Sequence, residues 1–372
     1  MQYWIWLSRC KGMSAAAKLA LYERLGSARA IYESGMLAQT GFEEAGRILQ
    51  RCEELGVGVL NAGQEQYPRR LIAIADPPLV LYYKGKLPNF DREAAIAVVG
   101  TRKASAYGLM IAETMGRQIS LHGGLVVSGM AAGVDAQAGW GAVRCGAPTV
   151  GVLGGGVDVV YPASNRALYE AVEACGCLIS EYPPGTAPGK WTFPQRNRII
   201  SGLCLGVLAV EAPEKSGTMI TVRDAQKQGR DLYVVPGQVG SAFCEGTNSL
   251  LAEGAYAATC GWDILRRYQA QFPEKIRQKA SRPEEISLPK PASEPKSAGK
   301  AVSAKAAVKA APKGDTAEEQ AVLDALSQGE RNYDEIITAT NLPAGKVLAV
   351  LTMLEIKGMV QTLPGRRAIR TI

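Results

Sequence analysis

The first part of the chain, residues 1–65, has apolar residues at the three- and four-residue spacing of short amphipathic helices. Gly26, Gly35 and Gly41 interrupt this pattern, because a glycine ends a helix more readily than a residue with a side chain. The predicted helices cover residues 15–25, 28–32 and 43–55. The pattern predicts a small helical domain of the helix-hairpin-helix or SAM-like type, for which a DNA-backbone contact and a protein-packing role both remain open.

Beyond the prolines at positions 68, 77 and 78, short apolar runs alternate with amphipathic stretches. Such runs are typical of buried parallel strands, and the stretches between them are long enough for crossover helices. The predicted strands cover residues 79–83, 95–99, 125–128, 149–153, 178–181, 205–211 and 232–235. The predicted helices cover residues 107–121, 135–145, 165–175, 194–203 and 219–228. This order predicts an α/β domain over residues 66–273 with a Rossmann-like, doubly wound, mostly parallel sheet, in which ligands bind beyond the carboxyl ends of the strands.

Residues 274–315 are rich in Lys, Ala, Pro and Ser and contain almost no large apolar side chains. Such a segment cannot bury a core, so we expect a flexible linker, with a secondary electrostatic contact to nucleic acid as the alternative. Residues 316–372 show helices at 317–326, 334–340 and 343–356 and then strands at 360–363 and 368–371, turned at residues 364–366. This order predicts a winged-helix domain. Its third helix has no Arg, Asn or Gln to read base edges, which favours a protein contact over duplex reading.

Composition narrows the class of protein. The 372 residues carry a formal net charge of +7 and are 47% hydrophobic, as in an ordinary globular protein. Residues 274–315 hold twice as many cationic as acidic side chains and account for most of this excess, so net charge alone does not establish nucleic-acid binding. No apolar stretch approaches the roughly 18 residues that cross a bilayer. The N-terminal cations follow the apolar run instead of preceding it, so we expect a cytoplasmic protein without a membrane span.

Cysteine and histidine give little support for a metal or cofactor. Most of the 8 cysteines lie in apolar runs, and none has the spacing of metal ligands, so we expect buried, reduced thiols and no metal or cofactor. The single histidine, His122, precedes two glycines at a predicted helix end and is expected to cap that helix.

Three loops between predicted strands and helices carry residues that commonly surround phosphate groups. In the loop after residues 95–99 a glycine allows close approach, the helix start offers free N–H groups, and an arginine adds a charged fork. The loops after residues 125–128 and 205–211 are also rich in glycine and in residues with a hydroxyl group, which can surround an anion in the same way. For the second loop, tight packing at its glycines and helix capping by Asp135 are equally good interpretations. The candidate residues are Thr101, Arg102, Ser128, Gly129, Lys215 and Ser216.

The densest local signal lies in residues 190–198, where three cations and two aromatic residues surround a predicted helix start. Cations hold DNA phosphates, and aromatic rings stack on unpaired bases. Arginines in a first helical turn oppose the helix dipole and therefore favour an anionic partner. Pairing of these arginines with Glu181 or Glu211 in the core is the alternative. The candidate residues are Lys190, Phe193, Arg196, Asn197 and Arg198.

Catalytic signatures are weak. The chain contains neither a P-loop nor a complete G-x-G-x-x-G motif, which argues against ATP hydrolysis and nicotinamide binding. A Ser-His-Asp site would need a base other than His122, and the sequence supplies no second histidine. Glu211 and Asp224 are the pair to watch if hydrolysis appeared. We therefore predict no catalytic residue.

Taken in order, the motifs resemble those of the DNA-processing protein A family, also called DprA or Smf. The blocks that carry the resemblance lie between residues 67 and 255: V-G-T-R at 99–102, S-G-M-A at 128–131, V-L-G at 152–154, Y-P at 161–162, I-S-E-Y at 179–182, F-P-Q-R-N-R-I-I at 193–200, S-G-T at 216–218 and V-P-G at 235–237. The helical N-terminus and the winged helix also fit that family's layout.

The resemblance implies a protein of natural transformation that binds single-stranded DNA, protects it and helps to load the recombinase RecA. It further implies a homodimer through the Rossmann-like domain and no catalytic activity. The DNA-binding positions carried over by motif are Thr101, Arg102, Ser128, Gly129, Lys190, Arg196, Asn197 and Arg198. One block departs from the family's pattern, since Ala138 and Gly139 stand where Ala-His is usual.

An enzyme remains the alternative class. Phosphoribohydrolases of the lysine-decarboxylase-like type are also Rossmann-like and carry a Gly-Thr block similar to that of residues 216–218. Those enzymes need a glutamate shortly after the block, and residues 221–223 offer none. Release of base from a nucleoside monophosphate would distinguish the two classes.

Overall fold

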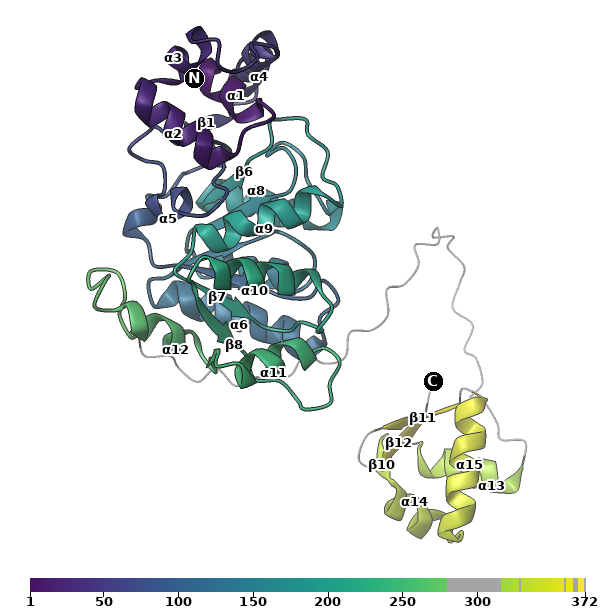
Figure 1. The fold of residues 1–372 in the computed structure, drawn as a ribbon. Helices are drawn as coiled ribbons and strands as arrows, with labels where there is room; N and C mark the ends of the chain where they lie inside the picture. The colour runs from purple at the N-terminus through teal and green to yellow at the C-terminus, as the bar shows by residue number, and fades with distance from the viewer. Residues whose placement is uncertain (280–315, 328, 358, 364–366, 371–372) are drawn as a thin grey trace. The chain divides into compact units, whose positions relative to one another are not determined.

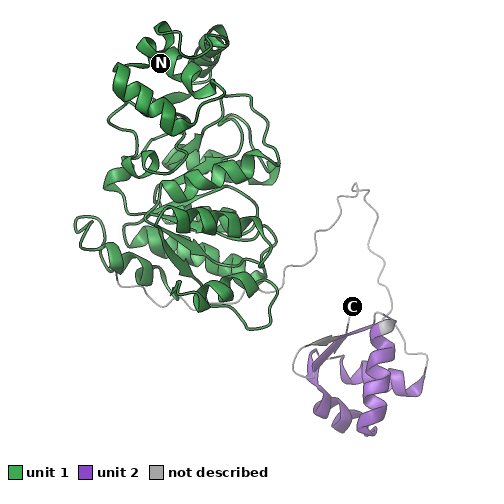
Figure 2. Ribbon diagram, viewed as in Figure 1, with its two compact units in different colours: residues 1–292 green, residues 293–372 purple. Residues whose placement is uncertain are grey.

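The computed structural model describes residues 1–279, 316–327, 329–357, 359–363 and 367–370. The chain divides into two compact units, residues 1–292 and 293–372, which we describe separately (Figure 2). Most of the predicted linker, residues 280–315, lies outside the described residues, and so does the predicted turn at residues 364–366. The domain boundaries after residues 65, 273 and 315 stay predictions.

The N-terminal part consists of four helices, α1 (Gln2–Arg9), α2 (Ala15–Leu25), α3 (Ala28–Glu33) and α4 (Phe42–Glu54) (Figure 1). The hydroxyl of Ser14 caps α2, and the hydroxyl of Ser27 caps α3, each accepting a hydrogen bond from the backbone three residues later. Helix α1 was not among the predicted helices, because residues 4–7 are all buried and show no polar face.

A nine-stranded sheet with the order β1-β2-β6-β5-β4-β3-β7-β8-β9 forms the centre of the first unit. Its strands are β1 (Gly58–Asn61), β2 (Val80–Gly85), β3 (Ala95–Val99), β4 (Leu125–Ser128), β5 (Thr149–Leu153), β6 (Cys177–Ser180), β7 (Gly206–Ala209), β8 (Asp231–Val234) and β9 (Tyr256–Ala257). The strands from β6 to β9 in this order are parallel, whereas β2 pairs antiparallel with both β6 and β1. The predicted Rossmann-like, mostly parallel sheet is confirmed.

Helices cover both faces of this sheet (Figure 1). They are α5 (Arg69–Ile72), α6 (Ala106–Leu121), α7 (Val134–Arg144), α8 (Arg166–Cys175), α9 (Thr192–Gly202), α10 (Gly217–Lys227), α11 (Glu245–Ala252) and α12 (Gly261–Leu265), with 3-10 turns at Phe90–Arg92, Ala163–Asn165 and Arg266–Tyr268. Alternate residues of β3 enter different cores. Ala97 and Val99 pack with Ile199 and Ile200 of α9, whereas Val98 packs with residues of α6 and α7. The central strand is therefore buried on both sides.

The chain reverses its direction across the sheet beside β3. From β3 the parallel strands proceed outward through β4, β5 and β6, and the chain then crosses to β7 on the other side of β3. Loops that leave neighbouring strands in opposite directions open a crevice at their carboxyl ends, which is where ligands bind in such sheets. The loops after β3 and β7 are therefore the place to look for a site.

The second unit contains three helices and a three-stranded antiparallel sheet of order β10-β12-β11. The elements are α13 (Ala317–Ala325), β10 (Arg331–Asn332), α14 (Tyr333–Thr340), α15 (Ala344–Ile356), β11 (Val360–Leu363) and β12 (Arg367–Arg370). In α15, Val347, Leu351 and Leu354 face the core at helical spacing. Within the described ranges no single helix is long and apolar enough to cross a membrane, although α14 and residues 344–355, bent by 107°, meet the criterion when joined.

Candidate nucleic-acid interface

A cavity of about 450 Å³ lies at the carboxyl ends of β3 and β7, where the crevice was expected. Its walls come from the loops after β3, β4 and β7, from one side of α9 and from the start of α10. The lining residues are Val99, Gly100, Thr101, Arg102, Ala131, Asp135, Lys190, Phe193, Pro194, Arg196, Asn197, Ile200, Ser216, Gly217, Thr218, Ile220 and Thr221. The structure thus brings seven of the predicted site residues together and leaves Ser128, Gly129, Arg198 and Lys215 outside the lining.

Glu211 holds the loop after β3. Its carboxylate accepts hydrogen bonds from the backbone N–H of Ser105 at 2.9 Å and from the Ser105 hydroxyl at 2.5 Å, and the Glu211 carbonyl accepts the N–H of Thr101 at 2.7 Å. The Ser105 hydroxyl in turn caps α6 through the N–H of Gly108. Because Glu211 is only 2% exposed, this carboxylate supports the loop that carries Arg102 and is not open to the cavity.

The loop after β4 is held by buried hydrogen bonds. The hydroxyl of Ser128 donates to the carbonyl of Val98 at 2.9 Å, and the N–H of Gly129 donates to the Asp135 carboxylate at 3.1 Å. Gly133 has a φ of +81°, and a Cβ atom there would lie 2.8 Å from the carbonyl oxygen of Arg102. In this loop the packing interpretation accounts for the observed contacts of Ser128 and Gly129.

Arg196 forms the deep wall of the cavity. Its side chain is buried, and its Nη1 donates hydrogen bonds to the carbonyl oxygens of Gly129, at 2.6 Å, and Val152. Its Nε donates to the amide oxygen of Asn197 at 3.2 Å. An arginine whose donors are taken up by backbone carbonyls helps to fix three segments of the sheet edge, and its contact with a ligand is limited to the donors that face the cavity.

Asp135 is the acidic group of the same wall. Burial raises the pKa of its carboxyl to about 6, against the opposing effects of the Arg196 charge and of N–H groups from Ala131 and Gly129. Burial also lowers the pKa of Arg196, with the charge of Asp135 opposing that shift. The two groups are therefore buried at the base of the cavity, and the charge of each favours the charged form of the other.

Phe193 is the aromatic residue among the described lining residues, and it contacts a second ring outside the lining. The Phe193 ring lies between the guanidinium of Arg102, 4.9 Å from the ring centroid, and the ring of Tyr161, at 5.5 Å between centroids. Tyr161 remains 46% exposed and Trp191 is 86% exposed. A large aromatic ring that is this exposed is unusual, so Trp191 offers more free ring surface to a base than Phe193 does. Sequence reasoning missed Tyr161 as a site residue, although the resemblance includes the Y-P block that begins there.

The remaining candidates lie on the solvent side. Lys190, Lys215 and Arg102 are exposed, and no ion pair is found for them within the described part of the chain. Ser216 precedes the first turn of α10, and the Asn197 amide donates to the carbonyl of Gly217 at 3.5 Å. Gly217 and Thr218 in the first turn of α10 line the cavity, so the free N–H groups at the start of this helix add positive potential to it.

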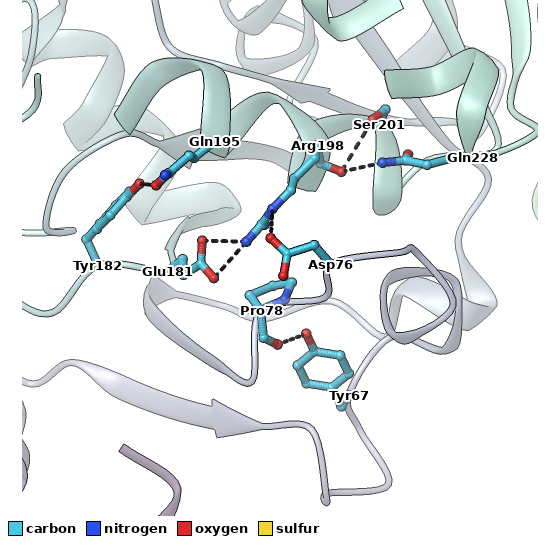
Figure 3. A network of polar contacts seen from close by, with 9 residues as sticks. All are labelled: Tyr67, Asp76, Pro78, Glu181, Tyr182, Gln195, Arg198, Ser201 and Gln228. Atoms are coloured by element: carbon cyan, nitrogen blue, oxygen red, sulfur yellow. Dashed lines mark hydrogen bonds and ion pairs between the residues drawn. The ribbon is translucent and has the colours of Figure 1, made fainter. Parts of the chain in front are cut away.

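Arg198 is not among the residues that line this cavity, and its side chain points toward Glu181 and Asp76 (Figure 3). It lines a second cavity of about 350 Å³ between the N-terminal helices and the sheet, together with Lys18 and Tyr82. Its guanidinium pairs with Glu181 and Asp76. Pairing with Glu181 is one of the alternatives that the sequence leaves open for the arginines of residues 190–198.

The cations of the cavity, Arg102 and Lys190, suit the binding of an anion. None of the described lining residues is a histidine or cysteine. His122 lies at the end of α6, where its Nδ1 accepts the N–H of Lys279 at 3.2 Å and burial lowers its pKa. No group of His, Cys, Asp and Glu among the described residues could hold a metal ion.

Fold and site together define a class: a Rossmann-like protein whose strand-end loops form a cationic cavity, with a separate winged helix. The chain belongs to the DNA recombination-mediator protein A (DprA) family, whose model matches residues 58–269. A model of the DprA winged helix domain matches residues 305–366, which confirms the predicted fold of the second unit.

Individual relatives agree with this assignment. The DNA processing protein DprA of Bacillus subtilis is 37% identical over 229 residues, which are 62% of this chain and 76% of the relative. The X-ray structure of DprA from Streptococcus pneumoniae has a TM-score of 0.61 and 32% identity, and the match covers 72% of this chain and 97% of that one. A structure that addresses the single-stranded DNA binding mode of DprA from Helicobacter pylori has a TM-score of 0.52 and 29% identity, covering 59% and 97%.

Proposed function

We propose that this chain binds single-stranded DNA in the cavity at the ends of β3 and β7 and acts there as a recombination mediator. The observation that carries the proposal is the set of exposed cations at one cavity together with two exposed aromatic rings next to its lining: Trp191 follows Lys190 in the chain, and Tyr161 contacts the ring of Phe193. Such a combination holds the phosphates of a strand and gives its unpaired bases surfaces for stacking. The family assignment and the single-stranded DNA that the Helicobacter pylori relative binds support it.

The residues divide into two roles. Arg102, Lys190 and Lys215 contact phosphates, because their charges are exposed at the cavity and on the loop after β7. Backbone and side-chain groups of Thr101, Asn197 and Ser216 add hydrogen bonds, and Phe193 presents the edge of a ring that Arg102 and Tyr161 already hold. Ser128, Gly129 and Arg196 shape the cavity from beneath. Trp191 and Tyr161 stack on bases.

The further roles of the family follow as part of the proposal. The bound strand is protected and passed to the recombinase RecA during natural transformation, and the protein acts in the cytoplasm as a homodimer through its Rossmann-like domain. The protein carries no catalytic activity of its own.

Fluorescence anisotropy with labelled poly-dT and a duplex of equal length, at several salt concentrations, tests the proposal. We expect tighter binding to the single strand and a steep loss of affinity with salt, with a slope of about −0.7 for each phosphate contact. Binding to neither DNA, together with release of base from nucleoside monophosphates, would instead favour the enzyme class. RecA loading is then measured as strand exchange on DNA that a single-strand-binding protein has already covered.

A further inference from the structure

Helix α9 separates two cavities. Phe193, Asn197 and Ile200 line the proposed DNA cavity and follow one another at the three- and four-residue spacing of one helix face. Gln195 and Arg198 lie on the opposite face and line the second cavity. Residues that are two positions from the DNA-facing ones point to the other side of a helix with 3.6 residues per turn. The position of α9 therefore sets the shape of both cavities.

The outer face of α9 is tied down by hydrogen bonds and ion pairs (Figure 3). The Nη2 of Arg198 donates to both carboxylate oxygens of Glu181 at 2.9 Å, and its Nε donates to Asp76 at 3.1 Å. One turn earlier, the hydroxyl of Tyr182 donates to the side-chain oxygen of Gln195 at 2.7 Å. Glu181 and Tyr182 directly follow β6, so these contacts connect the helix to the end of a strand.

The backbone of Arg198 is held as well. Its carbonyl oxygen accepts a hydrogen bond from the amide of Gln228, at the end of α10, at 3.0 Å (Figure 3). Because α10 begins at the DNA cavity with Gly217, this contact connects the two helices whose first turns form that cavity. Arg198 thus joins α9 to β6, to α10 and to the segment before β2.

We propose that Arg198 is a positioning residue for DNA binding: its ion pairs with Glu181 and Asp76 hold α9 so that the opposite face of the helix presents its side chains to the strand. The inference rests on the proposed function. The Arg198 side chain is only 16% exposed and its charge is met by two carboxylates. A DNA phosphate would have to displace these carboxylates, which the charge-assisted hydrogen bonds of Nη2 to Glu181 and of Nε to Asp76 resist.

The two possible roles of Arg198 can be distinguished experimentally, because they predict opposite changes in DNA affinity when Glu181 is replaced by glutamine. If Arg198 contacts phosphate, then E181Q removes a negative charge near the DNA and strengthens binding. If Arg198 positions α9, then E181Q weakens the pair that holds the helix and weakens binding. E214Q is the matched control, since Glu214 is an exposed acid of the loop before α10, with no ion pair among the described residues.

The second discriminating variant is R198K. A lysine keeps the charge for a phosphate, but its single nitrogen cannot replace both Nη2 at Glu181 and Nε at Asp76. If Arg198 is a positioning residue, a lysine at this position should therefore not preserve DNA affinity. We expect E181Q and R198K each to weaken poly-dT binding about tenfold, the scale of effect for groups that orient a site, with the wild-type salt slope retained. E214Q should bind at least as tightly as wild type.

The experiment measures poly-dT anisotropy at four salt concentrations for wild type, E181Q, R198K and E214Q, with thermal unfolding of each to select a temperature at which all are folded. If wild type does not bind poly-dT, the proposed function fails and this inference fails with it. If wild type binds and E181Q binds more tightly, or R198K binds as wild type, only the inference is refuted. Weaker binding by both variants with an unchanged slope supports it.

Discussion

Replacement of Arg196 by methionine should lower the free energy of unfolding of the first unit by several kcal/mol. It should leave the salt dependence of DNA binding nearly unchanged. The side chain is 4% exposed, and the variant keeps its volume approximately while removing the charge that faces Asp135. Breaking a buried pair by removal of one partner costs about 3–5 kcal/mol. The carbonyls of Gly129 and Val152 also lose their donor. Asp135 relieves part of this cost by binding a proton, so we expect a loss of about 3–4 kcal/mol at pH 7.

Urea unfolding followed by tryptophan fluorescence measures this loss for the first unit alone, because all 5 tryptophans lie before residue 292. R102M is the control at the same cavity, since Arg102 is exposed and its loss should alter stability by no more than about 0.5 kcal/mol. The double variant R196M/D135N should regain part of the stability. If R196M unfolds as wild type does while its DNA salt slope falls, Arg196 contacts phosphate and our account of the buried pair is wrong.

Three further predictions follow from single contacts. R102A should lower the poly-dT salt slope by about 0.7, as expected for one lost phosphate contact to a single strand; an unchanged slope would place Arg102 off the DNA. W191A should weaken poly-dT binding by about 1–3 kcal/mol, and binding should quench the fluorescence of wild type more than that of W191F; equal affinity of W191A would exclude stacking. Because the pKa of Asp135 is raised to about 6, its contribution to stability is present below pH 4 and is lost as the pH rises through 6. From pH 4 to 7, D135N should gain about 2 kcal/mol of unfolding free energy relative to wild type; a constant difference in urea unfolding would show that the pKa is ordinary.

The sheet could be predicted where its strands are buried on both sides. The bounds of β3, β4 and β5 match the predicted strands, because each is a continuous buried run that ends at a turn or loop. The strands β1 and β9 were missed. The first is half-exposed in part and the second is only 2 residues long and exposed, so neither shows an apolar run. Their place at the sheet edges needs the partner strand, which no local pattern contains.

The site could be predicted only as a set of loops. The order of strands and helices placed residues 100–102 and 216–217 at the same edge of the sheet, and the structure brings them to one cavity. Local sequence could not indicate that the carboxylate of Glu211 holds Ser105, because the two are 106 residues apart. Nor could local sequence show that the Phe193 ring is already in contact with the Arg102 guanidinium and the Tyr161 ring.

The arginines of α9 show why a motif does not assign the roles of its residues. Arg196 and Arg198 have the same chemistry and lie two positions apart, so a helix places them on opposite sides. One donates to backbone carbonyls beneath the DNA cavity, and the other pairs with carboxylates behind it. Neither is the exposed cation that a basic motif suggests, whereas Lys190 before the helix and Arg102 from another loop are. We therefore expect the phosphate contacts to come from the loops, and we expect the arginines of the helix to hold those loops and the helix in the geometry that a DNA strand requires.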